Sequence, residues 1–343
     1  MCAALLAAAG GIHAQQTVPR SLSADSATRA AIASRYPRDR SDTLRAFPIR
    51  ELGPCVFAVL GDTGRGVEGR PNAGFVVTPA GVVVIDALAS PGEGRVLLRT
   101  IRLVTRLPVR YLFLTHHHPD HTFGAIIFTR AAAKVIAHPD RRTLANMDGD
   151  DRLASDWTGV MGLEQMRGFA FADTPSIPVT ADTTLMVGGR RLEVIRPGAA
   201  HTAGDLMLWL PNERVLFAGD VLVEDGVSMM VDGGSDAMLR ALARIDALHP
   251  RVAVTGHGRV SGDPAKLVEA TRCYVLGLRS TMREATIPTT PGCQSGDEST
   301  SPFAPRATAV SACSMAAVSM LRSICWRSLF AESSARASGS ALS

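Results

Sequence analysis

The sequence lacks several features that would assign it to a particular class of protein. Its net charge is a modest +4, and it has no lysine and arginine run and no basic segment interleaved with aromatic residues, which argues against a nucleic-acid-binding protein. None of its six cysteines forms a Cys-x-x-Cys pair, so neither a disulfide scaffold nor a zinc ribbon is expected. The glycine-rich segment 61–71 has no Gly-Lys-Ser/Thr, which excludes a phosphate-binding loop.

The two ends of the chain differ in composition from its middle. Residues 1–14 are apolar and alanine-rich, too short to span a bilayer, and are followed by a plausible cleavage site after Ala14. They resemble a secretory signal peptide, which predicts a periplasmic or secreted protein. A basic start is missing, so the true start can lie upstream, and a disordered terminus is the alternative. We expect a polar linker over 15–46, one folded domain over 47–286, and a disordered or frame-shifted tail over 287–343.

The chain is organised around the stretch 110–122, where an apolar run ends in a group of polar side chains. Residues 112–114 have the pattern of a buried strand, and Pro119 prevents that strand from continuing. In an extended segment, residues two apart point to the same side, so His116 and His118 can share one metal ion. Beyond the proline, the next two polar residues can turn toward a second ion. The stretch therefore offers four metal-capable side chains: His116, His118, Asp120 and His121.

Three later segments each place a metal-capable side chain in a glycine-rich turn beside an apolar run, namely His201, Asp220 and His257. The order His-x-His-x-Asp-His, then distant His, Asp and His, resembles the metallo-β-lactamase fold superfamily, from about Phe47 to Ala285. The segment 72–86 also resembles the early paired strands of that family, which end in an aspartate. The resemblance implies an α/β protein, a four-layer αββα sandwich of two mixed β-sheets flanked by helices.

The resemblance also implies two metal sites with separate ligand sets. The first would use His116, His118 and His201, and the second Asp120, His121 and His257, with Asp220 bridging them. Three protein ligands and an open position are typical of a catalytic zinc. We therefore expect two Zn²⁺ per chain, with iron or manganese as alternatives at the oxygen-rich second site.

Such a pair of ions implies hydrolysis of a small-molecule substrate. A hydroxide shared by the two ions would attack the carbonyl of a lactone, ester, thioester or β-lactam. Asp120 would be catalytic, orienting the nucleophile and relaying its proton. His117 is expected to point away from the ions. Three further residues either orient ligand imidazoles or are ordinary turn and cap residues: Asp86, Thr122 and Thr202.

The sequence departs from the class B β-lactamases at three positions. Asp220 stands where their second zinc is held by a cysteine, Val223 where they carry a lysine for the carboxylate of the drug, and His121 where they have an arginine. Glu224 and Asp225 follow that valine, so a carboxylate-bearing β-lactam is expected to be a poor substrate if either acid faces it. The pattern looks more like glyoxalase II and the lactonases. A true β-lactamase, an iron-dependent sulfur dioxygenase and a non-catalytic accessory protein are the alternatives.

The apolar periodicity also predicts individual elements. The first strand is expected at 55–60, with strands at 74–78 and 82–86 and a helix over 92–107 after them. A helix over 123–130 and a strand over 131–137 follow, then a long amphipathic helix over 141–166. The second half is expected to hold strands at 184–187, 191–195, 205–210, 214–218 and 252–255, and helices at 236–248 and 264–284.

Overall fold

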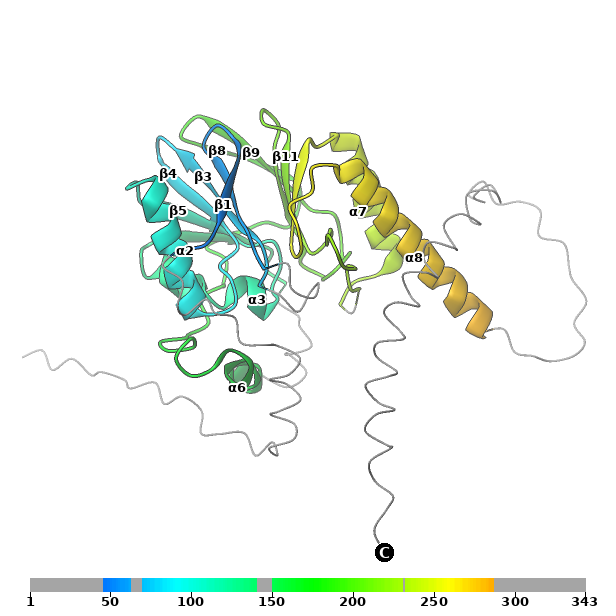
Figure 1. Cartoon of the computed structure of the whole chain (residues 1–343), viewed down its shortest axis with the longest axis horizontal. Coiled ribbons are helices and arrows are strands. Elements are labelled where there is room, and N and C mark those ends of the chain that lie inside the picture. Colours follow the sequence, from blue (N-terminus) through cyan, green and yellow to red (C-terminus); the bar gives the residue numbers. More distant parts are fainter. Residues whose placement is uncertain (1–45, 63–69, 141–149, 231, 287–343) are drawn as a thin grey trace, which may run out of the picture.

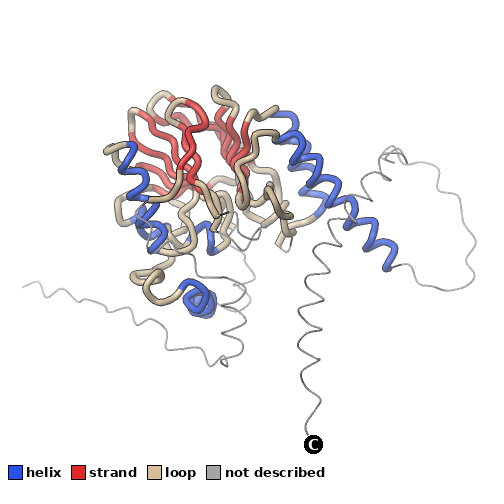
Figure 2. The backbone as a smooth tube through the Cα atoms, in the orientation of Figure 1, coloured by secondary structure: helices blue, strands red, loops and turns tan. Residues whose placement is uncertain are grey.

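A computed structural model describes residues 46–62, 70–140, 150–230 and 232–286 of the chain. The predicted signal peptide, all but the last residue of the 15–46 segment and the tail after 286 lie outside these residues. Two sheets pack face to face in the centre of the described body, with helices on their outer sides (Figures 1 and 2). The expected four-layer αββα sandwich is confirmed.

The first sheet is mixed, and its strands follow one another in chain order from β1 to β7. The strands from β1 to β4 pair antiparallel, and those from β4 to β7 pair parallel. Their bounds are β1 Ile49–Gly53, β2 Val56–Val59, β3 Ala73–Thr78, β4 Gly81–Ile85, β5 Val109–Phe113, β6 Lys134–Ala137 and β7 Ile177–Pro178.

The second sheet has the strand order β12-β11-β10-β9-β8. It is antiparallel except for the pairing of β11 with β12, which is parallel. Its strands are β8 Thr183–Val187, β9 Arg190–Ile195, β10 Met207–Leu210, β11 Val215–Gly219 and β12 Val252–Thr255. The described helices are α2 Pro91–Val104, α3 Pro119–Thr122, α4 Ala125–Thr129, α6 Asp150–Met161, α7 Ser235–Leu248 and α8 Pro264–Thr286.

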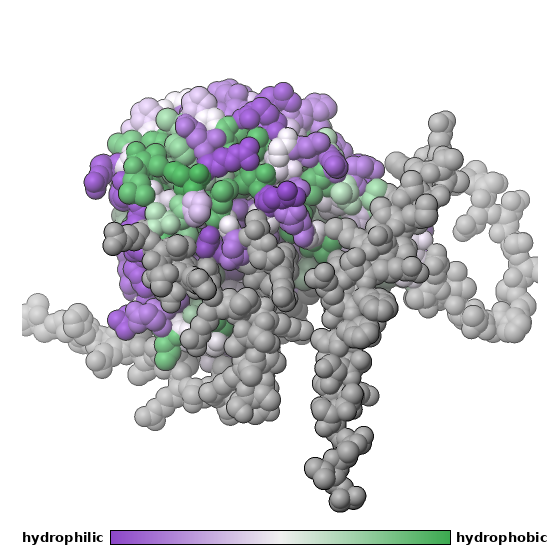
Figure 3. Space-filling model, in the orientation of Figure 1, coloured by the Kyte–Doolittle hydropathy of each residue, from purple (hydrophilic) through white to green (hydrophobic). Residues whose placement is uncertain are grey.

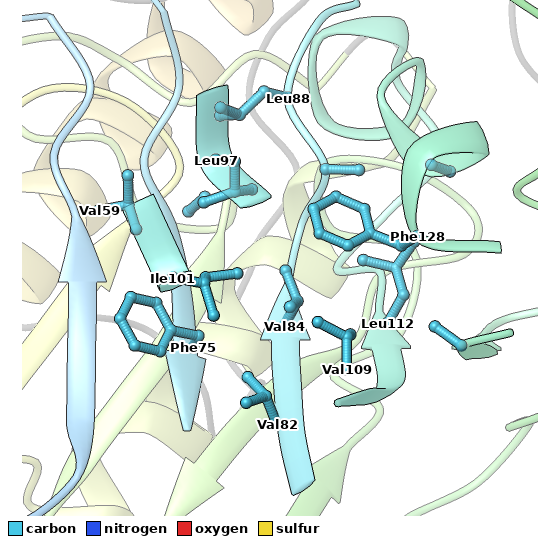
Figure 4. Packing of buried hydrophobic residues seen from close by; sticks show 14 of the residues in the cluster. Val59, Phe75, Val82, Val84, Leu88, Leu97, Ile101, Val109, Leu112 and Phe128 are labelled. Carbon is cyan, nitrogen blue, oxygen red and sulfur yellow. The ribbon is translucent and has the colours of Figure 1, made fainter. Parts of the chain in front are cut away.

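Three apolar cores hold the four layers together. One lies between the first sheet and the helices α2 and α4, and Figure 4 shows Ile101 of α2 beside Val84 of β4, with Leu97 nearer Leu88. The second fills the space between the sheets, and the third joins the second sheet to α7 and α8. Strand β4 is buried on both faces, since Val82 and Val84 face the helices while Val83 and Ile85 face the other sheet. That double burial explains its continuous apolar sequence.

Local chemistry fixes where α2 begins. Ser90 caps the helix, because its side chain accepts a hydrogen bond from the backbone N–H of Glu93 (3.1 Å), and Pro91 occupies the first turn. The Glu93 carboxylate accepts in return from the backbone N–H of Ala89 (2.8 Å). This reciprocal pair holds the segment that follows β4 close to the edge where the predicted site lies.

Three predicted elements differ from the structure. The first strand is β1 rather than the segment at 55–60, because three exposed residues give β1 no apolar pattern and only its pairing with β2 defines it. The bend at Pro119 is the first turn of the short helix α3, where a proline is well tolerated. The helix expected over 141–166 is described only as α6, and residues 141–149 lie outside the described residues.

Hydrophilic residues dominate the upper rim of the face shown in Figure 3, with hydrophobic residues among them. No helix within the described ranges combines the length and the apolar character that crossing a membrane requires.

Candidate metal centre

The predicted ligands gather at one edge of the sandwich, where several strands end. Asp86 follows β4, the His116–His121 stretch follows β5, Asp220 follows β11 and His257 follows β12. The carboxyl ends of parallel neighbours meet at one edge of a sheet, which is why residues far apart in sequence meet here. His201 arrives from the turn before β10, and the backbone bond from Leu206 N–H to Thr115 C=O (2.7 Å) joins that turn to the His116 loop.

Four predicted ligands form a first cluster: His116, His118, His201 and Asp220. Each offers one ligand atom, and these atoms all lie within 4.8 Å of one another. His201 Nε2 lies 3.0 Å from His118 Nδ1 and 3.5 Å from Asp220 Oδ2. His116 Nε2 is buried and has no hydrogen-bond partner among the described residues.

Asp120, His121 and His257 form a second cluster within the same 4.8 Å limit. His257 Nε2 lies 3.0 Å from Asp120 Oδ2 and 3.4 Å from His121 Nε2. Asp220 joins the two clusters, because its Oδ1 lies 3.2 Å from His121 Nε2 while its Oδ2 lies 3.5 Å from His201 Nε2. The structure thus brings all seven predicted ligands together.

Two glycine residues shape the backbone around Asp220, which joins the two clusters. A β-carbon at Gly256 would lie 1.7 Å from Asp220 Oδ1, so the Asp220 carboxylate occupies space that only a glycine leaves free. Gly219, with φ of +53°, turns the end of β11 in a conformation that L side chains rarely adopt, and a β-carbon there would lie 2.7 Å from the Thr115 side chain. The backbone N–H of Gly256 donates to the Gly219 carbonyl (2.8 Å) and fixes the two loops against each other.

Outer contacts select which ring nitrogen each histidine presents. Thr115 Oγ1 donates its proton to Asp86 Oδ2 (2.9 Å), so it accepts from His116 Nδ1–H (3.0 Å) and leaves Nε2 as the free acceptor. His121 Nδ1 faces Asp86 Oδ2 at 2.9 Å, which turns its Nε2 toward the cluster. Fixing the tautomer from the far side of the ring is the usual way in which proteins prepare a metal-binding imidazole.

The other two imidazoles of the first cluster are oriented in the same manner. His201 Nδ1 donates to the Met229 carbonyl (2.6 Å), which directs its Nε2 inward. His118 is reversed, because its Nε2 faces Asp232 Oδ2 at 3.3 Å and its Nδ1 faces His201. Two imidazole nitrogens 3.0 Å apart with both outer nitrogens protonated are two acceptors facing each other, which is stable only with a proton or a cation between them. The donor set therefore fits a bound transition-metal ion.

The pKa shifts caused by burial and by neighbouring charges also indicate a site for a cation. Burial lowers the pKa of His116 well below its usual value. Burial would raise the pKa of Asp120, but His121 and His257 lower it to about 2. Burial opposes the charge of His121 as well, yet the carboxylates of Asp120, Asp220 and Asp86 hold its pKa well above the usual value. Ionised carboxylates that attract protons onto buried imidazoles form a site suited to a cation.

Comparison with known proteins agrees with this geometry. The family model described as "Metallo-beta-lactamase superfamily" matches residues 66–257, more than half of the chain. The chain belongs to the metallo-beta-lactamase superfamily. Its fold is also similar to that of a solved metallo-beta-lactamase from Pontibacter korlensis, with a TM-score of 0.53 and 22% identity over 67% of this chain and 98% of that one.

Curated relatives of this superfamily chain carry different names. It is 28% identical to the alpha subunit of 2,4-dinitroanisole O-demethylase from Nocardioides sp. (strain JS1661), over 41% of this chain and 38% of that protein. It is 30% identical to a metal-dependent hydrolase from Thermofilum pendens, over 50% of this chain and 75% of the relative. It is 29% identical to a hydroxyacylglutathione hydrolase from Shewanella halifaxensis, over 49% and 53% respectively. The chain thus spans about half or less of two of these relatives.

Membership of the metallo-beta-lactamase superfamily and the His/Asp clusters together support the interpretation of the chain as a metal-dependent hydrolase. Two of the residues that the sequence offered as orienting groups form hydrogen bonds to other partners than an imidazole among the described residues. Thr122 Oγ1 donates to the His118 carbonyl (3.0 Å), within the turn of α3. Thr202 Oγ1 donates to Asp205 Oδ1 (2.6 Å). Asp205 in turn accepts from the backbone N–H of His201 (2.7 Å) and shapes that turn.

The acidic pair after Val223 does not face the clusters as an unpaired charge. Val223 is buried, and Asp225 accepts two hydrogen bonds from Arg259 at 2.7 Å each. Glu224 lies 3.8 Å from the same guanidinium group. The repulsion expected between these acids and an anionic substrate is therefore offset by Arg259. Val223 still places no cation where the class B β-lactamases of this superfamily carry a lysine.

Sequence reasoning missed several groups that hold the ligands, and most belong to one loop, residues 221–230 with Asp232. Within this loop, Glu224 N–H donates to the His257 carbonyl (3.1 Å), and Ser228 Oγ donates to the Asp220 carbonyl. The Met229 carbonyl and the Asp232 carboxylate contact His201 and His118, as described above. The loop therefore touches four predicted ligands from four separate segments. Only the acidic character of Asp232 was visible in the sequence, and an isolated acid in a glycine-rich loop carries no signal.

We expect Asp232→Asn to weaken metal binding at the first cluster by about 10-fold, the lower end of the effect of losing an outer partner. Asparagine keeps the shape of the side chain but removes the charge that attracts His118 Nε2–H. Competition with a chromophoric chelator measures the affinity. Asp236→Asn is the matched control, because Asp236 is exposed and pairs with Arg279. Equal affinities in the wild type and Asp232→Asn would contradict the orienting role.

Proposed function

We propose that this protein is a hydrolase with two divalent metal ions, zinc at least in the first site, that acts on a thioester, ester or lactone. The observation that carries the proposal is the position of Asp220, whose two oxygens lie beside one imidazole of each cluster. A carboxylate shared by two neighbouring groups of ligands is the arrangement that pairs two ions over one substrate. His121 and Asp220 in place of arginine and cysteine, and the name of the hydroxyacylglutathione hydrolase relative, support the ester-like substrate class.

The exposure of the ligands indicates the side from which a substrate approaches. The side chains of His118 and Asp120 are 23% and 21% exposed, while those of His121, His201, Asp220 and His257 are at most 5% exposed. A carbonyl compound would therefore reach the centre past His118 and Asp120. Bound divalent ions would supply an acidified water molecule and a polarised carbonyl there.

Asp120 is the group of this chain best placed to move a proton at the centre. Its Oδ2 lies 3.0 Å from His257 Nε2 and 3.5 Å from His121 Nε2, which fixes the carboxylate at the edge of the second cluster. The pKa of about 2 keeps this carboxylate ionised at neutral pH, so it can accept a hydrogen bond from a water nucleophile and orient it. The buried ligands hold their positions, and the exposed edge of Asp120 is free to contact the substrate.

A panel of substrates tests this proposal. We expect measurable turnover of a glutathione thioester, an uncharged aryl ester or a γ-lactone, with kcat/KM for the best of them about 10²-fold above that for a carbapenem, because no cation at Val223 receives the carboxylate of the drug. Elemental analysis of protein loaded with zinc or manganese should find about two ions per chain.

Asp120→Asn is the control for the panel, since loss of turnover in this variant separates the reaction of this centre from that of a contaminating esterase. A low-micromolar KM for the carbapenem with efficient turnover would favour the β-lactamase alternative. One ion per chain with sulfur dioxygenation would favour the iron enzyme.

A further inference from the structure

His117 is a buried imidazole whose two ring nitrogens both lack a hydrogen-bond partner among the described residues. Its side chain is only 5% exposed. Leaving a buried polar group unpaired costs roughly 1–3 kcal/mol, so such groups nearly always bind water, a proton donor or an ion. The side chain belongs to neither of the two clusters described above, and the proposed hydrolysis does not use it.

The Asp232 carboxylate lies close to His117. His117 Nε2 lies 4.0 Å from Asp232 Oδ2, too far for a hydrogen bond, and His118 Nε2 lies 3.3 Å from the same oxygen. All three ligand atoms lie within 4.8 Å of one another. Ligand atoms around a tetrahedral zinc ion are separated by about 3.4 Å, given bonds of roughly 2.0–2.1 Å. Of the three spacings, the one between His118 and Asp232 already fits, and the one between His117 and Asp232 needs a closure of about 0.6 Å. The spacing between the two imidazole nitrogens lies within the 4.8 Å limit, and a small rotation of the His117 ring would adjust it.

We propose that His117 Nε2, the Asp232 carboxylate and His118 Nε2 form a third site, for zinc or a similar divalent transition-metal ion. The ion would take the place of the proton that His118 Nε2 shares with Asp232, and that proton would pass to solvent. The two ring nitrogens of His118 would then face two different ions, with Nε2 toward the third site and Nδ1 toward the first cluster. Two cations on one imidazole repel each other, so the third site binds more weakly than the other two and fills only in excess metal.

The third site is open to solvent on one side. The side chains of His118 and Asp232 are 23% and 13% exposed, so an ion can enter past them while His117 forms the buried end. Filling the site removes the hydrogen bond by which Asp232 orients His118. The consequence is inhibition of turnover by excess metal, a consequence that rests on the proposed function, whereas the binding of the ion does not.

A small cavity offers a second place for a partner of His117. His117 also lines a small cavity, with about 10 Å³ of space for water centres, together with His138 and Asp140. That volume suits about one water molecule. The cavity does not include Asp232 or His118 among its lining residues. An ion in the cavity would depend on His138, whereas an ion in the proposed site would not, and a pair of variants can distinguish them.

The experiment compares the wild type, His117→Phe and His138→Phe at matched and at excess zinc. Crystals soaked in excess zinc and measured at the zinc absorption edge should show an additional anomalous peak beside Asp232 in the wild type and in His138→Phe. His117→Phe should lack that peak and keep the others. Excess zinc should lower kcat several-fold in the wild type and in His138→Phe, and leave His117→Phe unaffected.

The anomalous peak tests the third site, and the change in kcat tests its regulatory consequence. No peak beside Asp232 in the wild type, or a peak retained in His117→Phe or lost in His138→Phe, overturns the third site. If no substrate is turned over, the proposed function fails while the anomalous peak still decides the site. A peak without inhibition overturns the regulatory consequence alone. If phenylalanine at position 117 prevents folding, His117→Gln serves, because its amide keeps the size of the side chain and is a poor zinc ligand.

Discussion

Replacing Asp220 by alanine is expected to lower turnover by about 10²-fold or more, the scale of losing one preorganised charge from a catalytic centre. The two oxygens of this carboxylate lie 3.2 Å from His121 Nε2 and 3.5 Å from His201 Nε2, so one substitution removes a contact from both clusters. The second cluster should lose its ion first, because the first retains three histidines. Elemental analysis and kcat on the best substrate of the panel measure the two effects.

The fold should survive the loss of Asp220. The residue lies in a turn at the end of β11, and its backbone carbonyl, which accepts from Ser228 Oγ, remains in the variant. Asp220→Asn keeps the volume beside Gly256 and removes only the charge, so it separates electrostatics from packing. Asp225→Asn is the matched control for Asp220→Asn, since Asp225 lies in the loop that follows Asp220 and pairs with Arg259. Wild-type turnover and a full metal content in Asp220→Ala would show that this residue is only part of a turn.

The ligand positions could be predicted because each ligand follows, or lies beside, a run of apolar residues that forms a buried strand. A strand buried on both faces, such as β4 or β11, requires a run of apolar residues, and any polar residue directly after that run must lie at the edge of the sheet. The spacing His116-x-His118 then places two imidazoles on one side. The same logic located Asp220 after β11 and His257 after β12. Apolar burial, visible in the sequence, therefore determines where the site lies.

The orienting contacts could not be predicted because they depend on how loops fold back. Thr115 follows the predicted strand 112–114 without any signal of its own, yet its hydroxyl selects the tautomer of His116. A backbone carbonyl, that of Met229, orients His201, and no residue type signals such a role. Strand β1 was missed for a related reason, since its existence depends on pairing with β2 and not on its own apolar pattern.

Asp86 is the exception among the orienting residues, because the sequence did offer it. It follows β4 directly and adopts φ of +58°, a conformation that aspartate tolerates better than most residues. It is only 2% exposed and accepts hydrogen bonds from Thr115 N–H (2.8 Å), Thr115 Oγ1 (2.9 Å) and His121 Nδ1 (2.9 Å). One carboxylate thus connects Thr115, which orients His116 of the first cluster, to His121 of the second cluster.

We expect Asp86→Ala to reduce both the stability of the metal-free protein and the metal affinity of the second cluster. Three buried donors would lose their acceptor, which should lower the free energy of unfolding by about 3 kcal/mol or more, and alanine at a positive φ adds strain. The His121 ring would be free to rotate, so affinity at the second cluster should fall by about 10- to 100-fold. Chemical denaturation of the metal-free protein and chelator competition measure the two effects.

Asp205, a second buried aspartate, provides the control that tests whether the effect of Asp86→Ala is specific to the second cluster. Asp205 is 3% exposed and accepts from the backbone N–H groups of Ala200, His201 and Thr202, so Asp205→Ala should also cost stability. Its effect on metal binding, however, should fall on the first cluster, which contains His201, whereas Asp86→Ala should empty the second cluster first. If the two variants lost their ions in the same order, the loss would reflect general unfolding. Opposite orders of loss would demonstrate that each aspartate holds its own histidine in place.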